Sequence, residues 1–263
     1  MKHYFPDHII NKNGRVNIVL VGAGGTGSQV LSDLARLHFA LQALGHPGFD
    51  VTVFDDGPVR TANVGRQLFS PSDIGRNKAE VLVSRINRFF GLDWKAVQHN
   101  AGKAPLPQSD ILITAVDTAR ARKEIFRSAR RKVRYWLDTG NTAHTGQTVL
   151  GTLMPVPQPK KAKDVMDILP TVFDLYRDME KQDTTAKQGP SCSVAQALER
   201  QDLLINKMVA TCAMQLLWSA FRHGYVREHG AFVNLKPINV RSLPVDPETW
   251  KRMGWKPKEA KDN

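Results

Sequence analysis

Residues 16–27 read VNIVLVGAGGTG. The first six are a short apolar run rich in β-branched residues, which predicts a buried strand. Gly22, Gly24 and Gly27 follow with the spacing G-x-G-x-x-G, and residues 28–44 have helical periodicity. In that context the backbone N–H groups and the dipole at the helix start can meet phosphate oxygens. The stretch therefore predicts a nucleotide-binding turn between a strand and a helix, with a tight glycine turn that holds no ligand as the alternative.

The segments after this turn alternate between strand and helix patterns. Residues 49–54 form a second apolar run that closes on Asp55 and Asp56, which completes one βαβ unit. Such alternation is typical of a parallel sheet with helices on both faces. We therefore predict a Rossmann-like, doubly wound, mostly parallel α/β sheet with a C-terminal helix and an antiparallel strand extension. The further predicted elements are strands at 95–99, 111–115, 135–138 and 147–150 and helices at 78–90 and 118–130.

The composition changes after residue 154. Residues 155–190 are rich in Pro, Lys, Asp and Gln, which predicts a mobile excursion around one helix near 165–181 and makes the segment a candidate lid or partner contact. Residues 193–222 have the pattern of one long helix, and the apolar runs 231–235 and 238–243 predict a terminal hairpin. The expected organisation is a nucleotide-binding core at 1–154, the excursion at 155–190, a helix and terminal strands on the same domain at 191–250 and a charged tail at 251–263.

Length and composition narrow the class of protein. The chain has 263 residues, of which 41% are hydrophobic, no run of about 18 apolar residues and no N-terminal signal peptide, so we expect a cytoplasmic protein without membrane spans. Its two cysteines are too few for a disulfide framework or a four-cysteine zinc site, so no structural zinc is expected. The net charge of +12 suits a nucleotide, an acidic protein or nucleic acid, but basic clusters are equally typical of solvated helix faces and no nucleic-acid-binding motif is recognisable.

Charged residues gather near predicted strand ends and helix starts. Asp55 closes the second strand, where such folds place a carboxylate that accepts hydrogen bonds from ribose hydroxyls; the adjacent Asp56 leaves that choice open, and either could be a cap. Arg66, Lys78 and Asp117 fall on the expected carboxyl edge of the sheet, where ligands bind in open α/β folds. Nucleotidyl transfer builds charge on the α-phosphate and on pyrophosphate, which Arg, Lys and a carboxylate-held Mg²⁺ neutralise. The set favours a polyphosphate site over a nicotinamide pocket.

Residues 63–67 read NVGRQ, shortly after the second strand. With the glycine turn, Lys78 and Asp117, this motif resembles the ThiF/MoeB/HesA superfamily, to which ubiquitin-activating enzymes also belong. More narrowly, the chain is similar to the ThiF-like proteins of the PRTRC gene cassette, which accompany plasmid-type ParB-related genes. The resemblance implies an ATP·Mg²⁺ site over residues 15–150, adenylation of a carboxylate and a homodimer. In the family the carboxylate is often the C-terminus of a ubiquitin-like or sulfur-carrier protein; this sequence does not identify it.

The resemblance also implies a role for each matching residue. Arg66, Lys78 and Asp117 would act directly in catalysis. By the same match, Asp55 would hold the ribose and Asp117 would bind Mg²⁺. The turn of Gly22, Gly24, Gly25 and Gly27 would approach the phosphates. The phosphates would also be contacted by Asn63, Arg66 and Lys78, and Gln67 would support the loop that carries Asn63 and Arg66.

Of the remaining residues, Cys192 and Arg122 match the family less specifically. Cys192 lies at the start of the predicted long helix, where the helix dipole favours a thiolate. It resembles the transfer cysteine of the family, which implies a catalytic role through a thioester or persulfide. A cysteine without a catalytic role is the alternative. Cys212, among small and apolar residues, is expected to be a core residue. Arg122 matches a family arginine, with an exposed helix charge as the alternative.

The sequence also departs from the family pattern. Arg15 is the only candidate for the N-terminal arginine pair that reaches across the dimer in close relatives, and Gly57 stands where the family often has a second acid. Two other functions therefore stay open. One is a non-catalytic nucleotide-binding module of a complex encoded by a plasmid or mobile element, and the other is an NAD(P)-dependent oxidoreductase.

Overall fold

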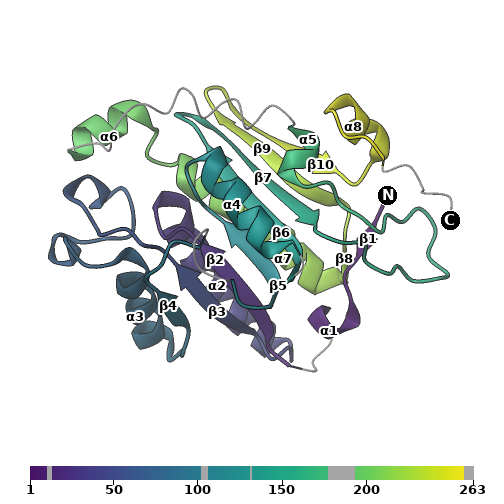
Figure 1. Cartoon of the computed structure of the whole chain (residues 1–263), viewed down its shortest axis with the longest axis horizontal. Helices are drawn as coiled ribbons and strands as arrows, with labels where there is room; N and C mark the ends of the chain where they lie inside the picture. Colours follow the sequence, from purple (N-terminus) through teal and green to yellow (C-terminus); the bar gives the residue numbers. More distant parts are fainter. Residues whose placement is uncertain (11–13, 102–105, 131, 177–192, 258–263) are drawn as a thin grey trace.

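The computed structural model describes residues 1–10, 14–101, 106–130, 132–176 and 193–257, and Figure 1 shows their arrangement. The strands of its central sheet are β2 (Val16–Val21), β3 (Phe49–Phe54), β4 (Lys95–Val97), β5 (Ser109–Thr114), β6 (Val133–Asn141), β7 (Thr145–Thr152), β9 (Glu228–Leu235) and β10 (Ile238–Pro244). They follow the order β10-β9-β7-β6-β5-β2-β3-β4. Along this order, the five neighbouring strands β6, β5, β2, β3 and β4 pair in parallel. The pairs β6-β7, β7-β9 and β9-β10 are antiparallel. The predicted Rossmann-like sheet with an antiparallel extension is confirmed.

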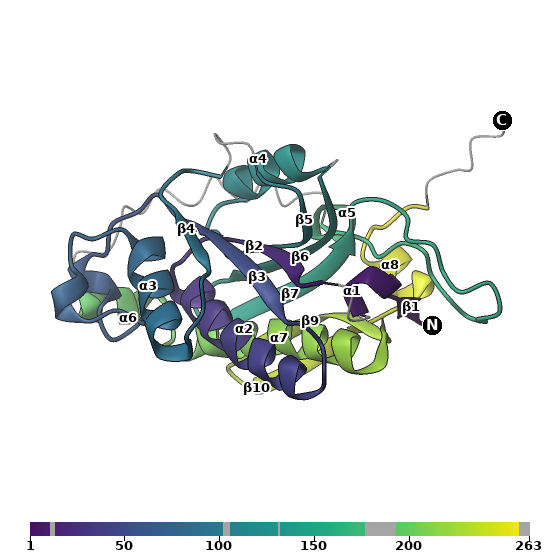
Figure 2. The same ribbon diagram turned by 90° about the horizontal axis from the view of Figure 1, so that it is seen from below.

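Helices cover both faces of this sheet, as Figure 2 shows. α2 (Gly25–Ala43), α3 (Lys78–Phe90) and α7 (Ile205–His223) lie on one face, and α4 (Ala119–Ala129) lies on the other. The units β2-α2-β3 and β3-α3-β4 extend the sheet in one direction, whereas β5-α4-β6 extends it in the other. The strand order therefore reverses between β2 and β5, and ligands of open α/β folds bind beside such a point.

Local signals explain why several predicted bounds agree with the structure. β2 and β3 are apolar runs whose side chains are mostly buried. α3 begins after Asn77, whose side chain accepts a hydrogen bond from the Glu80 N–H, and ends at Gly91, whose φ of 66° is left-handed. These features depend only on neighbouring residues. The predicted strands at 16–21 and 49–54 and the helix at 78–90 are therefore confirmed to the residue.

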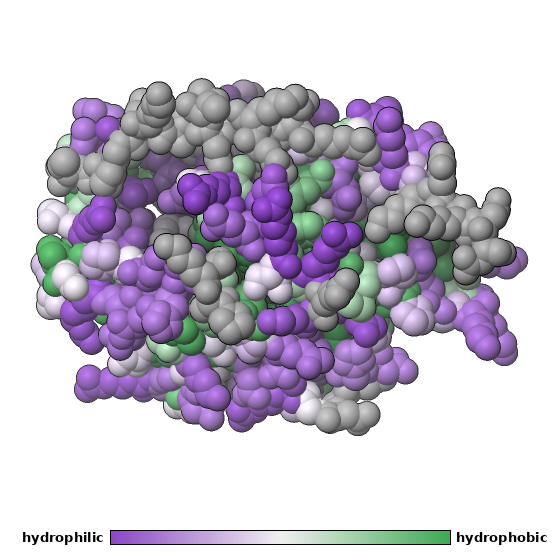
Figure 3. All heavy atoms as spheres, in the orientation of Figure 1, coloured by the Kyte–Doolittle hydropathy of each residue, from purple (hydrophilic) through white to green (hydrophobic). Residues whose placement is uncertain are grey.

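The outer face of α4 carries several of the positive charges of the chain. Arg120 and Arg127 are exposed along the helix, and Arg130 is exposed at its end. α4 crosses the middle of the face shown in Figure 3, which is mostly hydrophilic and has its hydrophobic residues in separate patches. Arg122 points the other way and is buried. The exposed-charge alternative for Arg122 is therefore wrong.

The single helix predicted at 193–222 is two helices in the structure. α6 (Val194–Arg200) and α7 meet at a bend of 63°. No glycine or proline lies between them, but Gln201 has an extended backbone, with φ −152° and ψ 129°. The N–H of Asp202 donates a hydrogen bond to the carbonyl of Ala143, and its carboxylate pairs with Lys236. Contacts with distant segments break this helix, which is why its amphipathic pattern did not reveal the break.

The helix predicted near 165–181 is also mostly wrong within the described residues. Only α5 (Val172–Leu175) is helical there, and residues 165–171 are not. Pro170 disfavours helical backbone at the residue before it, and the Asp174 carboxylate accepts hydrogen bonds from the N–H and hydroxyl of Thr171. These two effects delay the start of the helix to Val172. Residues 177–181 of the prediction lie outside the described residues.

The first strand and the last helix of the described residues pack against the body of the protein. The N-terminal strand β1 (His3–Tyr4) pairs with β8 (Tyr225–Val226), and α1 (Asp7–Ile10) follows it. The predicted hairpin is confirmed as β9 and β10, whereas the predicted tail begins inside α8 (Pro247–Arg252).

No helix in the described part of the chain is by itself long and apolar enough to cross a membrane. The bent pair of α6 and α7 has the length and composition of a membrane span only when its two helices are taken together.

Candidate active site

A polar pocket opens at the carboxyl ends of β2 and β5, where the strand order reverses. It encloses about 360 Å³, which is within the range of small-molecule sites. Segments that are far apart in the sequence form its wall, including the glycine turn, the loop before α3, the end of β5 and the junction of α6 and α7. The predicted site residues that line it are Gly24, Gly25, Arg66, Gln67, Lys78 and Asp117.

The glycine turn brings the start of α2 against the end of β5. Gly22 has a φ of 95°, which favours glycine, and a Cβ there would collide with the carbonyl of Ala115. A Cβ on Gly27 would collide with the carbonyl of Gly22. Gly22 and Gly27 therefore shape the turn rather than line the pocket. α2 begins at Gly25, three residues earlier than predicted, so its first N–H groups and its dipole lie at the pocket.

Asp55 supports the turn from the end of β3. Its Oδ2 accepts a hydrogen bond of 2.7 Å from the N–H of Ala23, and its Oδ1 accepts one of 2.8 Å from the N–H of Gly57. Asp55 does not line the pocket as it stands. A carboxylate oxygen can accept more than one hydrogen bond, so the ribose role of Asp55 stays a prediction.

Asn63 and Gln67 belong to the loop that carries Arg66. Asn63 is buried, and its Oδ1 accepts a hydrogen bond of 2.9 Å from the N–H of Arg60, which caps the short helix η1 (Thr61–Asn63). Asn63 also lies outside the pocket lining, so its contact with a phosphate stays a prediction. Gln67 is buried at the pocket wall, and its Oε1 has no hydrogen-bond partner among the described residues.

Arg66, Lys78 and Asp117 meet at the pocket from three different elements. Lys78 is the first residue of α3, and Asp117 is exposed just after β5. Burial lowers the pKa of the Arg66 guanidinium, and the Asp117 carboxylate acts in the opposite direction. An arginine nonetheless stays protonated at neutral pH. These three residues therefore bring two cationic side chains and one exposed carboxylate to a helix N-terminus, an arrangement that suits a polyphosphate with a bound cation. Arg122 and Arg200 also line the pocket.

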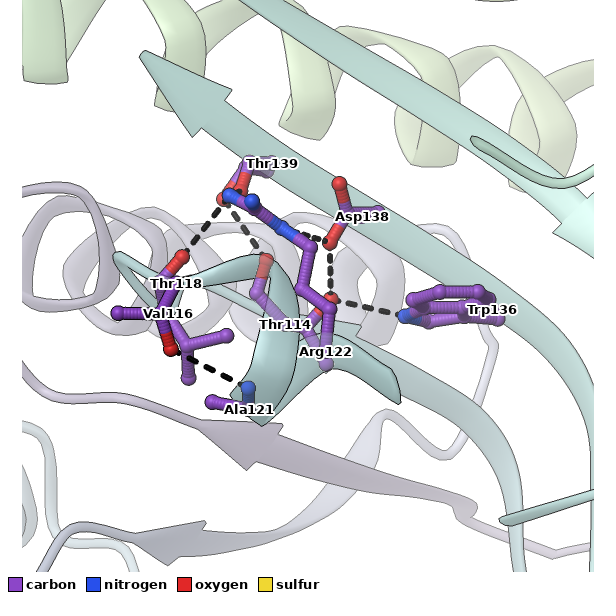
Figure 4. Close-up of polar contacts among 8 residues, drawn as sticks. All are labelled: Thr114, Val116, Thr118, Ala121, Arg122, Trp136, Asp138 and Thr139. Atoms are coloured by element: carbon purple, nitrogen blue, oxygen red, sulfur yellow. Dashed lines mark hydrogen bonds and ion pairs between the residues drawn. The ribbon is translucent and has the colours of Figure 1, made fainter. Parts of the chain in front are cut away.

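The ion pair of Arg122 and Asp138 is buried next to the loop of Val116 and Thr118, as Figure 4 shows. Arg122 Nε donates a hydrogen bond of 3.0 Å to Oδ1 of Asp138, and Arg122 Nη2 donates to the carbonyls of Val116 and Thr139 at 2.8 and 3.1 Å. Burial raises the pKa of Asp138, while Arg122 and a hydrogen bond from Thr114 act against that rise. Arg122 therefore joins the ends of β5 and β6 at the floor of the pocket.

The sequence did not identify several residues of this site. Asp138 ends a predicted strand and was assigned no role, although a carboxylate in an apolar strand pattern is a signal for a buried partner. Gln201 and Asn206 also line the pocket, and nothing in their local pattern marks them. Cys192 lies outside the described residues, and Cys212 is a half-buried free cysteine whose pKa burial raises.

A model of the ThiF family matches residues 4–251 of the chain. The chain belongs to the ThiF family. The NEDD8-activating enzyme E1 catalytic subunit of Saccharomyces cerevisiae is 31% identical over an alignment of 114 residues, and the match covers 41% of this chain and 35% of the yeast protein. The family match and this relative agree with the broader resemblance to ThiF and MoeB proteins.

Solved structures of E. coli MccB share the fold. MccB with MccA has a TM-score of 0.61 and 15% identity, and the match covers 90% of this chain and 65% of MccB. MccB with ATP has a TM-score of 0.59 at the same identity and coverage. This ThiF-family chain spans about a third of the yeast relative and just under two thirds of MccB. At this level of identity the structural match concerns the fold alone.

Proposed function

We propose that this ThiF-family protein binds ATP with Mg²⁺ and adenylates a carboxylate of a partner protein. The observation that carries the proposal is the placement of Arg66, Lys78 and Asp117 around the start of α2, at the point where the strand order reverses. Cations at this place can bind the triphosphate, and an exposed carboxylate beside them can hold a metal ion.

The proposed reaction is a transfer of the AMP group. An oxygen of the partner's carboxylate attacks the α-phosphorus, the bond from that phosphorus to the bridging oxygen of the β-phosphate breaks, and pyrophosphate leaves with the bonding electron pair. The products are an acyl-adenylate and pyrophosphate. Negative charge grows on the departing pyrophosphate, which Arg66 and Lys78 in the pocket lining can stabilise.

The residues present suit Mg²⁺. Mg²⁺ in nucleotide sites is bound by one or two carboxylates together with phosphate oxygens, and it neutralises phosphate charge when bound. Asp117 offers an exposed carboxylate at the pocket, and its negative charge acts on Arg66. Asp117 would hold the ion beside the triphosphate, and Arg122 would hold the Asp117 loop through its bond to Val116.

The finer parts of the proposal concern the partner and the fate of the adenylate. MccB is recorded with MccA, and the yeast relative is the catalytic subunit of a NEDD8-activating enzyme, which supports a polypeptide C-terminus as the carboxylate. Transfer to Cys192, a homodimer and membership of the PRTRC-cassette group belong to the same proposal. A Cys192→Ser variant that still forms the adenylate but no thioester or persulfide would support the transfer step.

A thermal-shift titration of the purified protein tests the nucleotide part. ATP with Mg²⁺ at about 100 times its Kd adds ~2.7 kcal/mol and should raise Tm by about 5 °C or more. Lys78→Ala should remove most of this shift, whereas Lys95→Ala, which changes an exposed lysine of β4 outside the pocket, should keep it. A shift with NADH alone would favour the oxidoreductase alternative, and no shift with any nucleotide would refute the proposal.

The chemical step needs a separate measurement, because ATP binding alone also fits a non-catalytic nucleotide-binding module. ATP–pyrophosphate exchange with labelled pyrophosphate should depend on a polypeptide with a free C-terminal carboxylate. Amidation of that C-terminus should abolish the exchange, since an amide cannot form the adenylate. Exchange that is absent with every such polypeptide, in a protein that binds ATP, would leave the non-catalytic module as the function.

A further inference from the structure

Gln201 lies between α6 and α7, outside every motif that points to the nucleotide site, and still contacts Arg66 of that site. Its Oε1 accepts a hydrogen bond of 2.6 Å from Nη1 of Arg66 and one of 3.1 Å from Nδ2 of Asn206. Its Nε2 donates one of 3.5 Å to the carbonyl of Thr142. Both polar atoms of the Gln201 amide are thus engaged at the pocket wall.

Asn206 extends these contacts to the glycine turn. The hydroxyl of Thr26, near the start of α2, donates a hydrogen bond of 3.0 Å to Oδ1 of Asn206. A Cβ on Gly25 would lie 2.7 Å from the Asn206 amide, so this side chain packs directly on the turn. Asn206 is itself buried. A continuous chain of hydrogen bonds therefore links Thr26, Asn206, Gln201 and Arg66.

The chemistry of Gln201 suits contact with Arg66, whose positive charge must stay available to bind phosphate. Arg66 is half-buried, its Nε has no hydrogen-bond partner among the described residues, and burial lowers its pKa. A carboxylate in place of Gln201 would form an ion pair with Arg66 and cancel its charge. A neutral amide oxygen instead fixes the direction of the guanidinium and leaves its positive charge in the pocket.

We propose that Gln201 is a positioning residue that holds Arg66 toward the triphosphate, and that Asn206 ties this arrangement to the glycine turn. The inference rests on the proposed function, because it concerns the same nucleotide. Arg66 comes from the loop before α3, so its direction depends on a partner from another segment. Gln201 therefore affects the binding of the outer phosphates and leaves the binding of a nucleoside monophosphate unchanged.

Isothermal titration of Mg·ATP and of AMP into four proteins tests this inference: wild type, Gln201→Met, Arg66→Ala and the double variant. Methionine keeps the size of glutamine and removes both polar atoms. Each single substitution should weaken ATP binding about tenfold, which corresponds to ~1.4 kcal/mol. The double variant should be no weaker than Arg66→Ala, because Gln201 acts through Arg66. AMP affinity should change less than about twofold in all four, since that is only ~0.4 kcal/mol.

Two further variants make the outcome decisive. Gln201→Glu should weaken ATP binding more than Gln201→Met, since the new carboxylate both neutralises Arg66 and repels phosphate. Gln215→Ala is the control, because Gln215 lies on α7 outside this pocket and its amide donates a hydrogen bond to the Ser219 hydroxyl, away from Arg66. Gln215→Ala should bind ATP as wild type does. Far-ultraviolet circular dichroism and Tm show whether each variant is folded. If Gln201→Met does not fold, Gln201→Asn takes its place.

The outcomes separate the two ideas. In one outcome, the wild type binds ATP while the two single losses of ATP affinity add up in the double variant, to about a hundredfold in total. That result would overturn the positioning role of Gln201 and leave the proposed function intact. Equal losses of ATP and AMP affinity in Gln201→Met would also overturn it, because they would indicate a general disturbance of the pocket. A wild type that binds no ATP would overturn both ideas.

Discussion

The Nε atom of Arg122 lies 3.0 Å from Oδ1 of Asp138, and both side chains are buried, at 9% and 1% exposure. Two charges in such a place are stable only together, since removal of one leaves the other without compensation. Thr114 donates a second hydrogen bond to the same carboxylate oxygen, and Trp136 donates one to the Thr114 hydroxyl. The pair fixes the loop that carries Asp117 at the pocket.

The first prediction concerns this pair. Asp138→Ala should lower the free energy of unfolding by about 3–5 kcal/mol, because the Arg122 charge would stay buried without its partner. Arg122→Met combined with Asp138→Leu should cost clearly less than Asp138→Ala alone, because no charge then remains. Urea denaturation measures both values. Equal losses in the two proteins would indicate that packing rather than charge makes this site stable.

The second prediction concerns Asp117 and the metal ion. Asp117→Asn should weaken ATP binding in the presence of Mg²⁺, because a carboxylate that holds the ion is lost. In EDTA the same substitution should tighten ATP binding, because a negative charge that repels the triphosphate is removed. Titration of ATP under both conditions measures this change of sign. The same direction of change with and without Mg²⁺ would show that Asp117 does not hold the ion.

The third prediction concerns the glycine turn. Gly27→Ala should destabilise the protein by about 3 kcal/mol, the upper end of the cost of overpacking, because the new methyl group would collide with the carbonyl of Gly22. Gly24→Ala is the matched control, since a Cβ there meets nothing within 4 Å, and only its backbone, at φ −82° and ψ −145°, disfavours alanine. It should cost about 1 kcal/mol, clearly less than Gly27→Ala. Similar unfolding free energies for the two variants would refute this account of the turn.

The fourth prediction concerns stability in acid. His3 and His229 are buried, and burial lowers the pKa of each from 6.5 to about 4. The neutral rings fit their surroundings: Nδ1 of His3 donates to the carbonyl of Met166 while its Nε2 accepts from the Tyr135 hydroxyl, and Nδ1 of His229 donates to the carbonyl of Leu150. Between pH 6.5 and 4 the unfolded chain therefore binds protons that the folded protein does not.

The stability that these rings contribute is complete above pH 6.5 and is lost as the pH falls toward 4. A shift from 6.5 to about 4 corresponds to roughly 3 kcal/mol for each ring. Urea denaturation at pH 7 and pH 4.5 should show a smaller loss of stability for His229→Gln than for wild type. An exposed histidine, His8, provides the control variant, and His8→Gln should lose stability in acid as wild type does. Parallel losses in all three proteins would contradict the assignment.

The sequence by itself determined the elements whose signals are local. β2 and β3 are apolar runs, Asn77 and Gly91 mark the two ends of α3, and the spacing of Gly22, Gly24 and Gly27 marks the turn. Because the carboxyl ends of parallel strands meet at one edge of a sheet, these local signals also predicted that Arg66, Lys78 and Asp117 would share one pocket, which the structure shows.

Only the tertiary structure decided the features that join distant parts of the chain. Gln201 meets Arg66 across a sequence separation of 135 residues, and Arg122 meets Asp138 across 16. The break between α6 and α7 comes from the contacts of Gln201 and Asp202 with the loops that carry Arg66 and Ala143, and no glycine or proline marks it. Hydrophobic periodicity reports which face of a helix is buried, but the partner of a single polar side chain depends on how the whole fold places it.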